Sequence, residues 1–304
     1  MSFPPLHVLF HKVRETLSTV FKLNVTLDEI KMNQGLLLTA LQEGKTSRRL
    51  RDFEFKIFSQ WGEDGIIQHL TRVVEIRNHT FIEFGVENFF ESNCRFLMMK
   101  DNWSGFIIDG SAAHLNRLRK SHFFWKHELT ARNAFITRDN INALLAESGF
   151  DEDLGILSVD IDGNDYHVLE AITGFRPRIL ICEFNTVFGP SRKISVPYAA
   201  DFQRTAQHYS NLYFGASLAA MTLLAAKRGY SLVGVNLANA FYVRNDLLNE
   251  RLEVVTPEQV FFPSKERQSR DQQGNPTFLA GDDRLKVLRG MPVVNVETGV
   301  PETL

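Results

Sequence analysis

The periodicity of apolar and polar positions changes near residue 55 of the chain. Before that point, Val13, Leu17 and Val20 recur at helical spacing and predict a helical stretch over residues 6–46. A second apolar run, Leu36–Gln42, follows the Asn33–Gly35 segment. The basic stretch that follows, Thr46–Arg51, is interpreted as a solvated connector or, alternatively, as a strip that contacts phosphate.

Beyond residue 55, short strand-like apolar runs alternate with helical ones. The expected strands are 80–84, 105–109, 126–130, 155–160, 179–184, 230–235 and 240–244. The expected helices are 64–75, 92–101, 113–121, 140–148, 165–172 and 218–228. Runs such as Ile179–Cys182 are apolar at successive positions, as in a strand that is buried on both faces. This alternation predicts an α/β fold with a largely parallel sheet and helices on both faces.

The last part of the chain differs from the helical stretch before residue 55 and from the alternating strands and helices after it. Five prolines stand among glycines and charged residues over 256–304, and Ser264–Asn275 is strongly polar. We expect a loop, or a partly ordered tail that packs on the domain or on a partner. The organisation is therefore a single domain over 55–245, with a helical extension over 1–54 and a Pro-rich extension over 246–304.

Composition narrows the function classes. Hydrophobic residues make up 44% of the 304 residues and charged ones 23%, which excludes a disordered or fibrous protein. A formal net charge of −2 gives no general attraction to nucleic acid or anionic membrane. No window approaches a membrane span of about 20 apolar residues, and the first residues do not resemble a secretory signal. We expect a cytoplasmic protein, with an apolar N-terminal helix that could pair two copies.

Candidate chemistry stands where the predicted strands end, because ligands of open parallel sheets bind beyond the carboxyl ends of the strands. The first strand leads into Glu83, Gly85 and Glu87, and glycine permits a close backbone approach to a ligand. The second strand ends in Asp109, which lies 24 residues after Gly85 and can accept both hydroxyls of a ribose. Together these signals predict a nucleoside-binding domain.

A cluster of acids follows the two later strands. Asp160, Asp162 and Asp165 lie at one strand end, and Glu183 and Asn185 at the next. If the two strands are neighbours, their oxygens suit a hard cation such as Mg²⁺, with Asp160, Glu183 and Asn185 as its ligands. The alternative is a pair of carboxylates that bind substrate hydroxyls without a metal. Asp165 has a second interpretation as a helix N-cap.

Four segments together resemble the FkbM-like family of S-adenosylmethionine-dependent methyltransferases. They are Phe58–Gly65, Phe81–Glu87, Ile108–Ser111 and Ser158–Tyr166, and the likeness covers roughly residues 55–245. The resemblance implies a seven-stranded, Rossmann-like class I methyltransferase fold whose last strand is inserted antiparallel.

The resemblance also implies roles for individual residues toward S-adenosylmethionine. The positions implied to bind the cofactor are Gln60, Glu63, Glu83, Gly85, Glu87, Asp109, Gly110, Ser111, Asn140 and Asp160. Glu83, Gly85 and Glu87 would line the methionine end, and Asp109 would hold the ribose. One departure is Asn88–Phe90, where a small or acidic residue and a glycine are common in such enzymes. The two phenylalanines there are expected to narrow the cofactor pocket.

Relatives of this kind often methylate hydroxyl groups of sugars or natural products, so a small molecule or a glycan is the expected acceptor. A hydroxyl is a weak nucleophile and needs a base or a metal to take its proton. Asp160 and Asp162 are the candidate acids for this step, with Mg²⁺ as a candidate cofactor. His208 is the candidate imidazole base.

Two other functions compete with methyl transfer. The triplet Asp160–Asp162 also occurs in metal-dependent nucleotide-sugar glycosyltransferases, although here it follows the fourth predicted strand. A non-catalytic binding protein that retains the fold is the third hypothesis. Asn88–Phe90 and the Pro-rich tail are the features that favour it.

Overall fold

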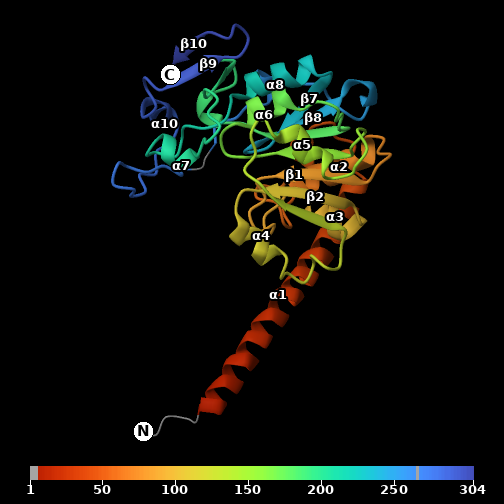
Figure 1. Cartoon of the computed structure of the whole chain (residues 1–304). Coiled ribbons are helices and arrows are strands. Elements are labelled where there is room, and N and C mark those ends of the chain that lie inside the picture. Colours follow the sequence, from red (N-terminus) through yellow and green to blue (C-terminus); the bar gives the residue numbers. More distant parts are fainter. Residues whose placement is uncertain (1–5, 265–266) are drawn as a thin grey trace.

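A seven-stranded sheet forms the centre of the molecule. The computed structural model describes residues 6–264 and 267–304 (Figure 1). The strand order is β3-β2-β1-β4-β5-β8-β7, and β8 runs antiparallel to both of its neighbours. The strands are β1 (Thr80–Phe84), β2 (Ser104–Asp109), β3 (Leu129–Asn133), β4 (Ile156–Val159), β5 (Ile179–Glu183), β7 (Tyr230–Val235) and β8 (Asn239–Arg244). The predicted fold class is therefore confirmed, including the antiparallel strand near one edge.

Helices cover both faces of this sheet (Figure 1). On one face lie α2 (Glu63–Val73), α3 (Arg95–Asp101) and α4 (Ala112–Leu118), whose apolar residues share a core with Phe81, Ile107 and Ile181. On the other face lie α5 (Ile141–Ala146), α6 (Asp165–Ala171) and α8 (Leu218–Lys227), packed on Ile82, Leu157 and Leu180. Neighbouring residues of one strand thus enter opposite cores, which explains the continuous apolar runs in the sequence.

One long helix precedes the domain. α1 (Leu6–Glu43) is continuous through the Asn33–Gly35 segment that separates the two apolar runs in the sequence. Gly35 does not break the helix. It is buried against α3, and a Cβ there would lie 2.4 Å from the ring of Phe96. The glycine permits a close helix–helix contact, and the N-terminal half of α1 projects from the body of the molecule (Figure 1).

The Pro-rich tail is more ordered than the sequence predicts. It supplies β9 (Pro292–Asn295) and β10 (Pro301–Thr303), which form a second sheet of order β10-β9-β6 with β6 (Ile194–Ser195). It also contains α9 (Pro257–Val260) and α10 (Asp282–Lys286). The short helix α7 (Arg204–Gln207) comes earlier in the chain, between β6 and α8. Of the two expectations, a loop or a tail that packs on the domain, the second agrees with the pairing of β9 with β6. The strands and helices of the tail were not expected. Pro257, Pro292 and Pro301 each stand at the first residue of an element, where proline is tolerated.

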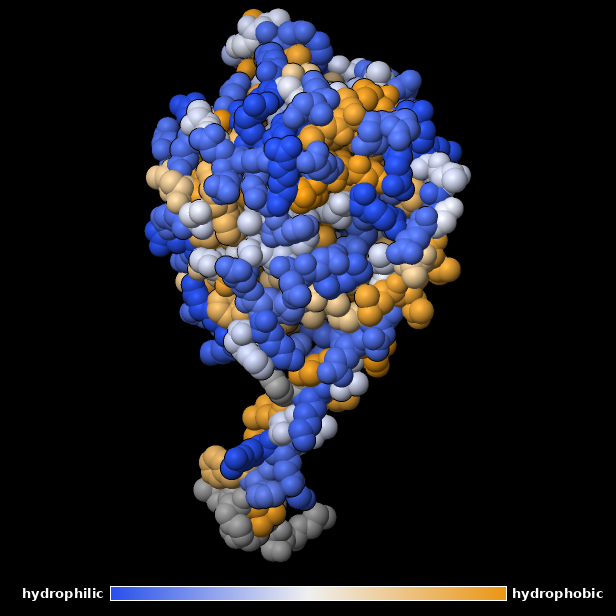
Figure 2. All heavy atoms as spheres, turned by 90° about the vertical axis from the view of Figure 1, so that its right-hand side faces the viewer, coloured by the Kyte–Doolittle hydropathy of each residue, from blue (hydrophilic) through white to orange (hydrophobic). Residues whose placement is uncertain are grey.

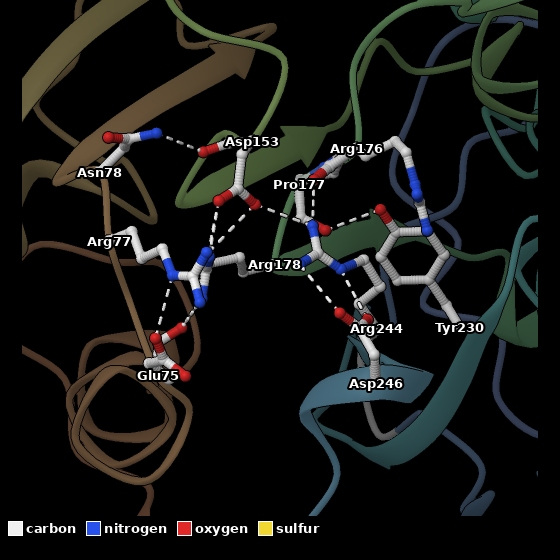
Figure 3. A network of polar contacts seen from close by, with 10 residues as sticks. All are labelled: Glu75, Arg77, Asn78, Asp153, Arg176, Pro177, Arg178, Tyr230, Arg244 and Asp246. Atoms are coloured by element: carbon white, nitrogen blue, oxygen red, sulfur yellow. Dashed lines mark hydrogen bonds and ion pairs between the residues drawn. The ribbon is translucent and has the colours of Figure 1, made fainter.

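The amino-terminal edge of the main sheet is closed by a network of charged groups (Figure 3). Asp153, just before β4, accepts hydrogen bonds from the buried guanidinium of Arg178 at 2.5–3.1 Å and from Arg244 at 2.8 Å. Arg178 also donates to the backbone carbonyl of Glu75. Asp153 thereby ties together the starts of β4 and β5 and the end of β8.

Among the helices of the described ranges, α1 included, we find none with the length and apolar character needed to cross a bilayer.

Candidate functional site

A crevice opens at the carboxyl edge of the sheet, between β1 and β4, where the strand order reverses. Such switch points are where open α/β sheets bind ligands. Two adjoining cavities occupy the crevice. The Asp109 cavity, of about 250 Å³, includes Asp109, Ser111 and Phe135 in its lining. The Glu83 cavity, of about 300 Å³, is lined by residues that include Glu83 and Glu183.

The two cavities meet at the loops that follow β1 and β4. Gly85, Glu87, Asp160 and Asp162 line both of them. Gly85 has a φ of +66°, and a Cβ at this position would lie 1.8 Å from the backbone oxygen of Asp160. Only glycine lets the two loops approach this closely, so it determines the width of the crevice at its centre.

One wall of the Asp109 cavity is formed by the carboxylate of Asp109, which hydrogen bonds from the backbone hold in place. Asp109 Oδ2 accepts a hydrogen bond from the backbone N–H of Glu87 at 2.8 Å, and Oδ1 accepts one from Ser111 at 2.7 Å. Ser111 in turn caps α4, its side chain accepting from the backbone of His114. Because each carboxylate oxygen has a second lone pair, Asp109 remains able to accept hydrogen bonds from a ligand.

Another part of this cavity's lining is apolar and lies just before Asn140 in the chain. Ala134, Phe135 and Ile136 line it, whereas Asn140 does not. The Asn140 side chain instead accepts from the backbone of Thr137 and donates to the backbone carbonyl of Phe135. Asn140 therefore shapes the loop that carries the wall.

The floor of the Glu83 cavity is a buried acid held by its own loop. Glu83 accepts hydrogen bonds from the Ser92 hydroxyl at 2.7 Å and from the backbone of Asn93 at 2.7 Å. Burial raises its pKa to about 7, although these hydrogen bonds oppose the shift. Glu83 is thus poised to hold or release a proton near neutrality.

Gln60 and Glu63, both implied to bind the cofactor, have different surroundings in the structure. Gln60 is exposed and lines the Glu83 cavity. Glu63 is buried, and its Oε1 accepts from the side-chain amides of Asn236 and Asn239 at 2.6 and 2.9 Å. Glu63 therefore ties the β7–β8 turn to the start of α2, and it is not among the residues that line either cavity.

Asp160 and Glu183 lie side by side because β4 and β5 are neighbours, as the acid pattern requires. Burial raises the pKa of each well above its usual value. The negative charges of Asp162 and Asp165 raise the pKa of Asp160 further, and the charge of Asp160 raises that of Glu183. One Glu183 oxygen is buried without a hydrogen-bond partner in the described part of the chain. Ligand atoms of Asp160, Asp165 and Glu183 lie within 4.8 Å of one another. This set of oxygens can take up a shared proton or a divalent cation.

Asp165 and Asp162 occupy different places in this cluster. Asp165 is buried, and its carboxylate accepts from the backbone N–H groups of Ile161 at 2.7 Å and Gly163 at 2.9 Å. It is the first residue of α6, which Asn164 precedes as the cap, so Asp165 is not the N-cap considered from the sequence. Asp162 is largely exposed and forms a 2.6 Å ion pair with Arg204.

Like Glu63 and Asn140, the predicted site residues Asn185 and His208 lie outside the two cavities. Asn185 is buried, donates to the backbone carbonyls of Leu212 and Phe214 at 2.9 Å, and accepts from the backbone of Val187. These bonds hold the loop after β5, so we do not retain Asn185 among the metal ligands. His208 bonds Ser210 at 2.8 Å and packs on Tyr209. It is absent from the lining of both cavities.

The phenylalanines of the β1 loop do not narrow the pocket. Phe89 is fully buried and stacks on Phe81 in the core, with a centroid distance of 6.4 Å. Phe90 packs on Phe123 at 6.1 Å. Neither residue lines the Asp109 or the Glu83 cavity. The prediction was wrong because the left-handed backbone of Phe89, with a φ of 62°, turns this side chain toward the core.

Several wall residues were not predicted. Phe202 and Arg204 come from the segment after β5, and Gln268 comes from the tail. These segments carry no motif in the sequence. Asn93 was missed as well, although it follows a predicted helix start.

Comparison with known proteins gives likenesses of fold. No family model matches the chain, and no curated protein matches it. The CurJ carbon methyltransferase matches 60% of this chain at 10% identity, with a TM-score of 0.36, and the match spans about half, 52%, of that chain. A Klebsiella pneumoniae protein described as an O-methyltransferase matches 71% of this chain and 90% of its own at 11% identity, with a TM-score of 0.41. A Staphylococcus aureus protein described as a caffeoyl-CoA O-methyltransferase matches 74% and 99% at 13% identity, with a TM-score of 0.39.

Proposed function

We propose that the crevice binds S-adenosylmethionine and that the protein methylates a hydroxyl group of a sugar or a related polyhydroxylated small molecule. The observation that carries the proposal is the meeting of the two cavities at Gly85 and Asp160. One cavity has the chemistry for a nucleoside and the other for a cationic amino-acid end, joined at the switch point of the sheet.

The Asp109 cavity suits adenosine. The fixed carboxylate of Asp109 accepts hydrogen bonds from the two ribose hydroxyls, and the apolar wall of Phe135 and Ile136 packs against the base. The Glu83 cavity suits the methionine end, because Glu83 and Glu87 offer negative charge to an ammonium and a sulfonium group. In this assignment the residues implied by the sequence resemblance keep their roles, apart from Glu63 and Asn140, which support the walls.

The rest of the Glu83 cavity suits a hydroxyl-rich acceptor. Gln60, Asn239 and Gln268 contribute amides to its lining, and amides and carboxylates recognise hydroxyl groups by donating and accepting hydrogen bonds. The acids outnumber the single arginine of this cavity, Arg204, which is already paired with Asp162. An acceptor that is anionic close to its reacting hydroxyl would be repelled here.

S-adenosylmethionine, when bound, supplies a methyl group on sulfur, which an acceptor oxygen takes in a single displacement. The chain's own residues hold the reactants in line, and such positioning supplies much of the rate. Asp160 lines both cavities and Glu183 lies beside it in the Glu83 cavity, and their raised pKa values favour uptake of the proton that the acceptor hydroxyl loses.

A divalent cation also fits this pair, and we propose Mg²⁺ assistance with Asp160 and Glu183 as ligands and Asp165 close by. The unpartnered oxygen of Glu183 and the short spacing of the three carboxylates support it. A bound Mg²⁺ would lower the pKa of the acceptor hydroxyl. Asp165 already serves two backbone N–H groups, so its main part is to fix the Asp160 loop.

A glycosyltransferase site of the Asp-x-Asp kind has less support. Asp160 faces Glu183, whereas Asp162 is drawn away into an ion pair with Arg204. The two aspartates of the triplet therefore have different partners. The phenylalanines that favoured a non-catalytic protein also lie outside the crevice.

The test is ligand binding by calorimetry and thermal shift, with S-adenosylmethionine, S-adenosylhomocysteine and UDP-sugars. We expect binding of the first two in the micromolar range or tighter, and none of UDP-sugars. Binding of UDP-sugars alone would overturn the methyltransferase proposal, and no binding at all would favour a non-catalytic role.

Metal assistance is tested separately with EDTA and a panel of sugar acceptors. We expect EDTA to lower methyl transfer at least tenfold and added Mg²⁺ to restore it, with binding of S-adenosylhomocysteine unchanged. Full activity in EDTA would leave Asp160 and Glu183 as a proton-accepting pair without a metal.

A further inference from the structure

The projecting helix α1 has an exposed apolar stripe along most of its length. The stripe consists of Phe10, Val13, Leu17, Val20, Leu23, Leu27, Ile30, Leu37 and Leu41. Each of these side chains leaves 49–71% of its surface exposed. Figure 2 shows apolar residues between hydrophilic ones along this helix, below the body of the molecule. Contiguous exposed apolar surface on a protein marks an interaction site.

The spacing of the stripe is that of a coiled-coil seam. Successive members are three or four residues apart, and Gln34 fills the one longer step between Ile30 and Leu37. A repeat near 3.5 residues keeps the seam facing a second helix, whereas a surface helix that packs on a globular core repeats nearer 3.6. At 1.5 Å per residue the stripe extends roughly 46 Å.

The chain's own domain does not cover the stripe. Asp28, Gly35 and Gln42 face the domain and are buried, whereas the neighbouring stripe members Ile30, Leu37 and Leu41 lie on another side of the helix and are exposed. From Phe10 to Asn24, every residue whose side chain is described is exposed. A lone helix of this length has little stability of its own in water, so the projecting half needs a partner.

We propose that this partner is a second copy of the chain and that two α1 helices pair in parallel along the stripe. The area is sufficient: nine large side chains offer on the order of 1,000 Å², against roughly 800 Å² per partner in a stable interface. The charge also fits, since α1 carries four basic and four acidic residues. That balance gives no attraction to anionic lipid, which a membrane-surface helix usually has.

Gln34 determines the orientation. In a parallel pair, Gln34 meets Gln34 of the second copy, and the two amides can hydrogen-bond each other. In an antiparallel pair that overlaps the whole stripe, Gln34 falls opposite Leu17, and its amide loses water without gaining a partner. The parallel arrangement also leaves each domain on the outer side of its own helix.

The experiment is the mass of the full chain in solution by sedimentation at micromolar concentration. We expect twice the 34.8 kDa of one chain. The double variant Leu17→Glu with Leu27→Glu should sediment as a monomer. Leu36→Glu is the matched control, because Leu36 is an exposed leucine of the same helix that lies off the stripe, and it should remain dimeric.

Disulfide trapping keeps the proposal testable if the charged variant fails to fold. Both native cysteines, Cys94 and Cys182, are buried, so an added cysteine is the reactive one. Under mild oxidation, Leu17→Cys should cross-link in at least tenfold excess over Lys22→Cys, which lies off the stripe. A monomeric chain, equal cross-linking of the two variants, or binding to anionic vesicles in place of dimerisation would overturn the proposal.

Discussion

The acids at the two edges of the main sheet have opposite pKa shifts. At the amino edge, Asp153 lies between the guanidinium groups of Arg178 and Arg244 (Figure 3). Burial alone would raise its pKa, but the hydrogen bonds from the two arginines outweigh burial and hold it below the usual value. At the carboxyl edge, Asp160 and Glu183 face each other, and their pKa values are raised.

This difference separates charge that stabilises the fold from charge that costs stability. An acid with a lowered pKa contributes to the free energy of unfolding at neutral pH, and one with a raised pKa subtracts from it. Groups kept at a cost to stability cluster at functional sites. The carboxyl edge is therefore the place to look for chemistry, and the following changes test that division.

Removing the Asp109 carboxylate from the crevice should strongly weaken binding. We expect Asp109→Ala to weaken S-adenosylhomocysteine binding at least 100-fold, because the ribose loses its acceptor. Calorimetry measures the affinity. Asp246→Ala removes an acid from the opposite edge and should bind normally. Normal affinity of Asp109→Ala would mean that the nucleoside lies elsewhere.

Removing a carboxylate from the amino edge should cost stability and leave binding intact. Asp153→Asn leaves the buried Arg178 without its counter-charge, and we expect a loss of about 3 kcal/mol in the free energy of unfolding. Urea unfolding measures it, with the exposed Asp151→Asn as the neutral control. The deficit should shrink as pH falls below 3.8, where the Asp153 advantage is lost. A deficit that is constant with pH would contradict the ion-pair explanation.

Glu83 should give stability the opposite dependence on pH. Its pKa rises from 4.5 to about 7 on folding, so the folded chain binds the extra proton in that window. The free energy of unfolding should therefore fall as pH rises from 4.5 to 7, by on the order of 3 kcal/mol from this group. Glu83→Gln should remove that part of the slope, whereas the exposed Glu91→Gln should keep it. An unchanged slope in Glu83→Gln would show that another group titrates.

The smallest expected effect is a gain in stability. Glu183→Gln removes an acid whose own pKa is raised by burial and by the charge of Asp160, and we expect unfolding at pH 7 in EDTA to cost about 1 kcal/mol more than in the native chain. Glu152→Gln, an exposed change, serves as the control. A loss as large as that of Asp153→Asn would mean that both edges use their acids to hold the fold.

Periodicity in the sequence predicts most of the sheet. The seven strands were expected close to their places, since each carries its own apolar run. β3 was predicted three residues early, because this edge strand is only partly buried and alternates weakly. The small second sheet was not predicted, because its strands are two to four residues long and two of them begin with proline.

The site was predictable where a strand end fixes the side chain. Asp109, Asp160 and Glu183 follow directly from strand position and the order of the sheet. Glu63 begins a helix and Asn140 and Asn185 stand just before one, and hydrogen bonds to nearby groups decide the direction of their side chains. Arg204 and Gln268 reach the crevice through tertiary packing of segments that carry no local signal.

The second sheet also has a consequence for the order of folding. β6 pairs with β9 across 101 positions of the chain, since Ile194 stands opposite Asn295. Closing a loop of that size is slow relative to forming the hairpin of β7 and β8. We expect the main sheet and the crevice at its carboxyl edge to form first. The second sheet should form last, when the end of the chain pairs with β6.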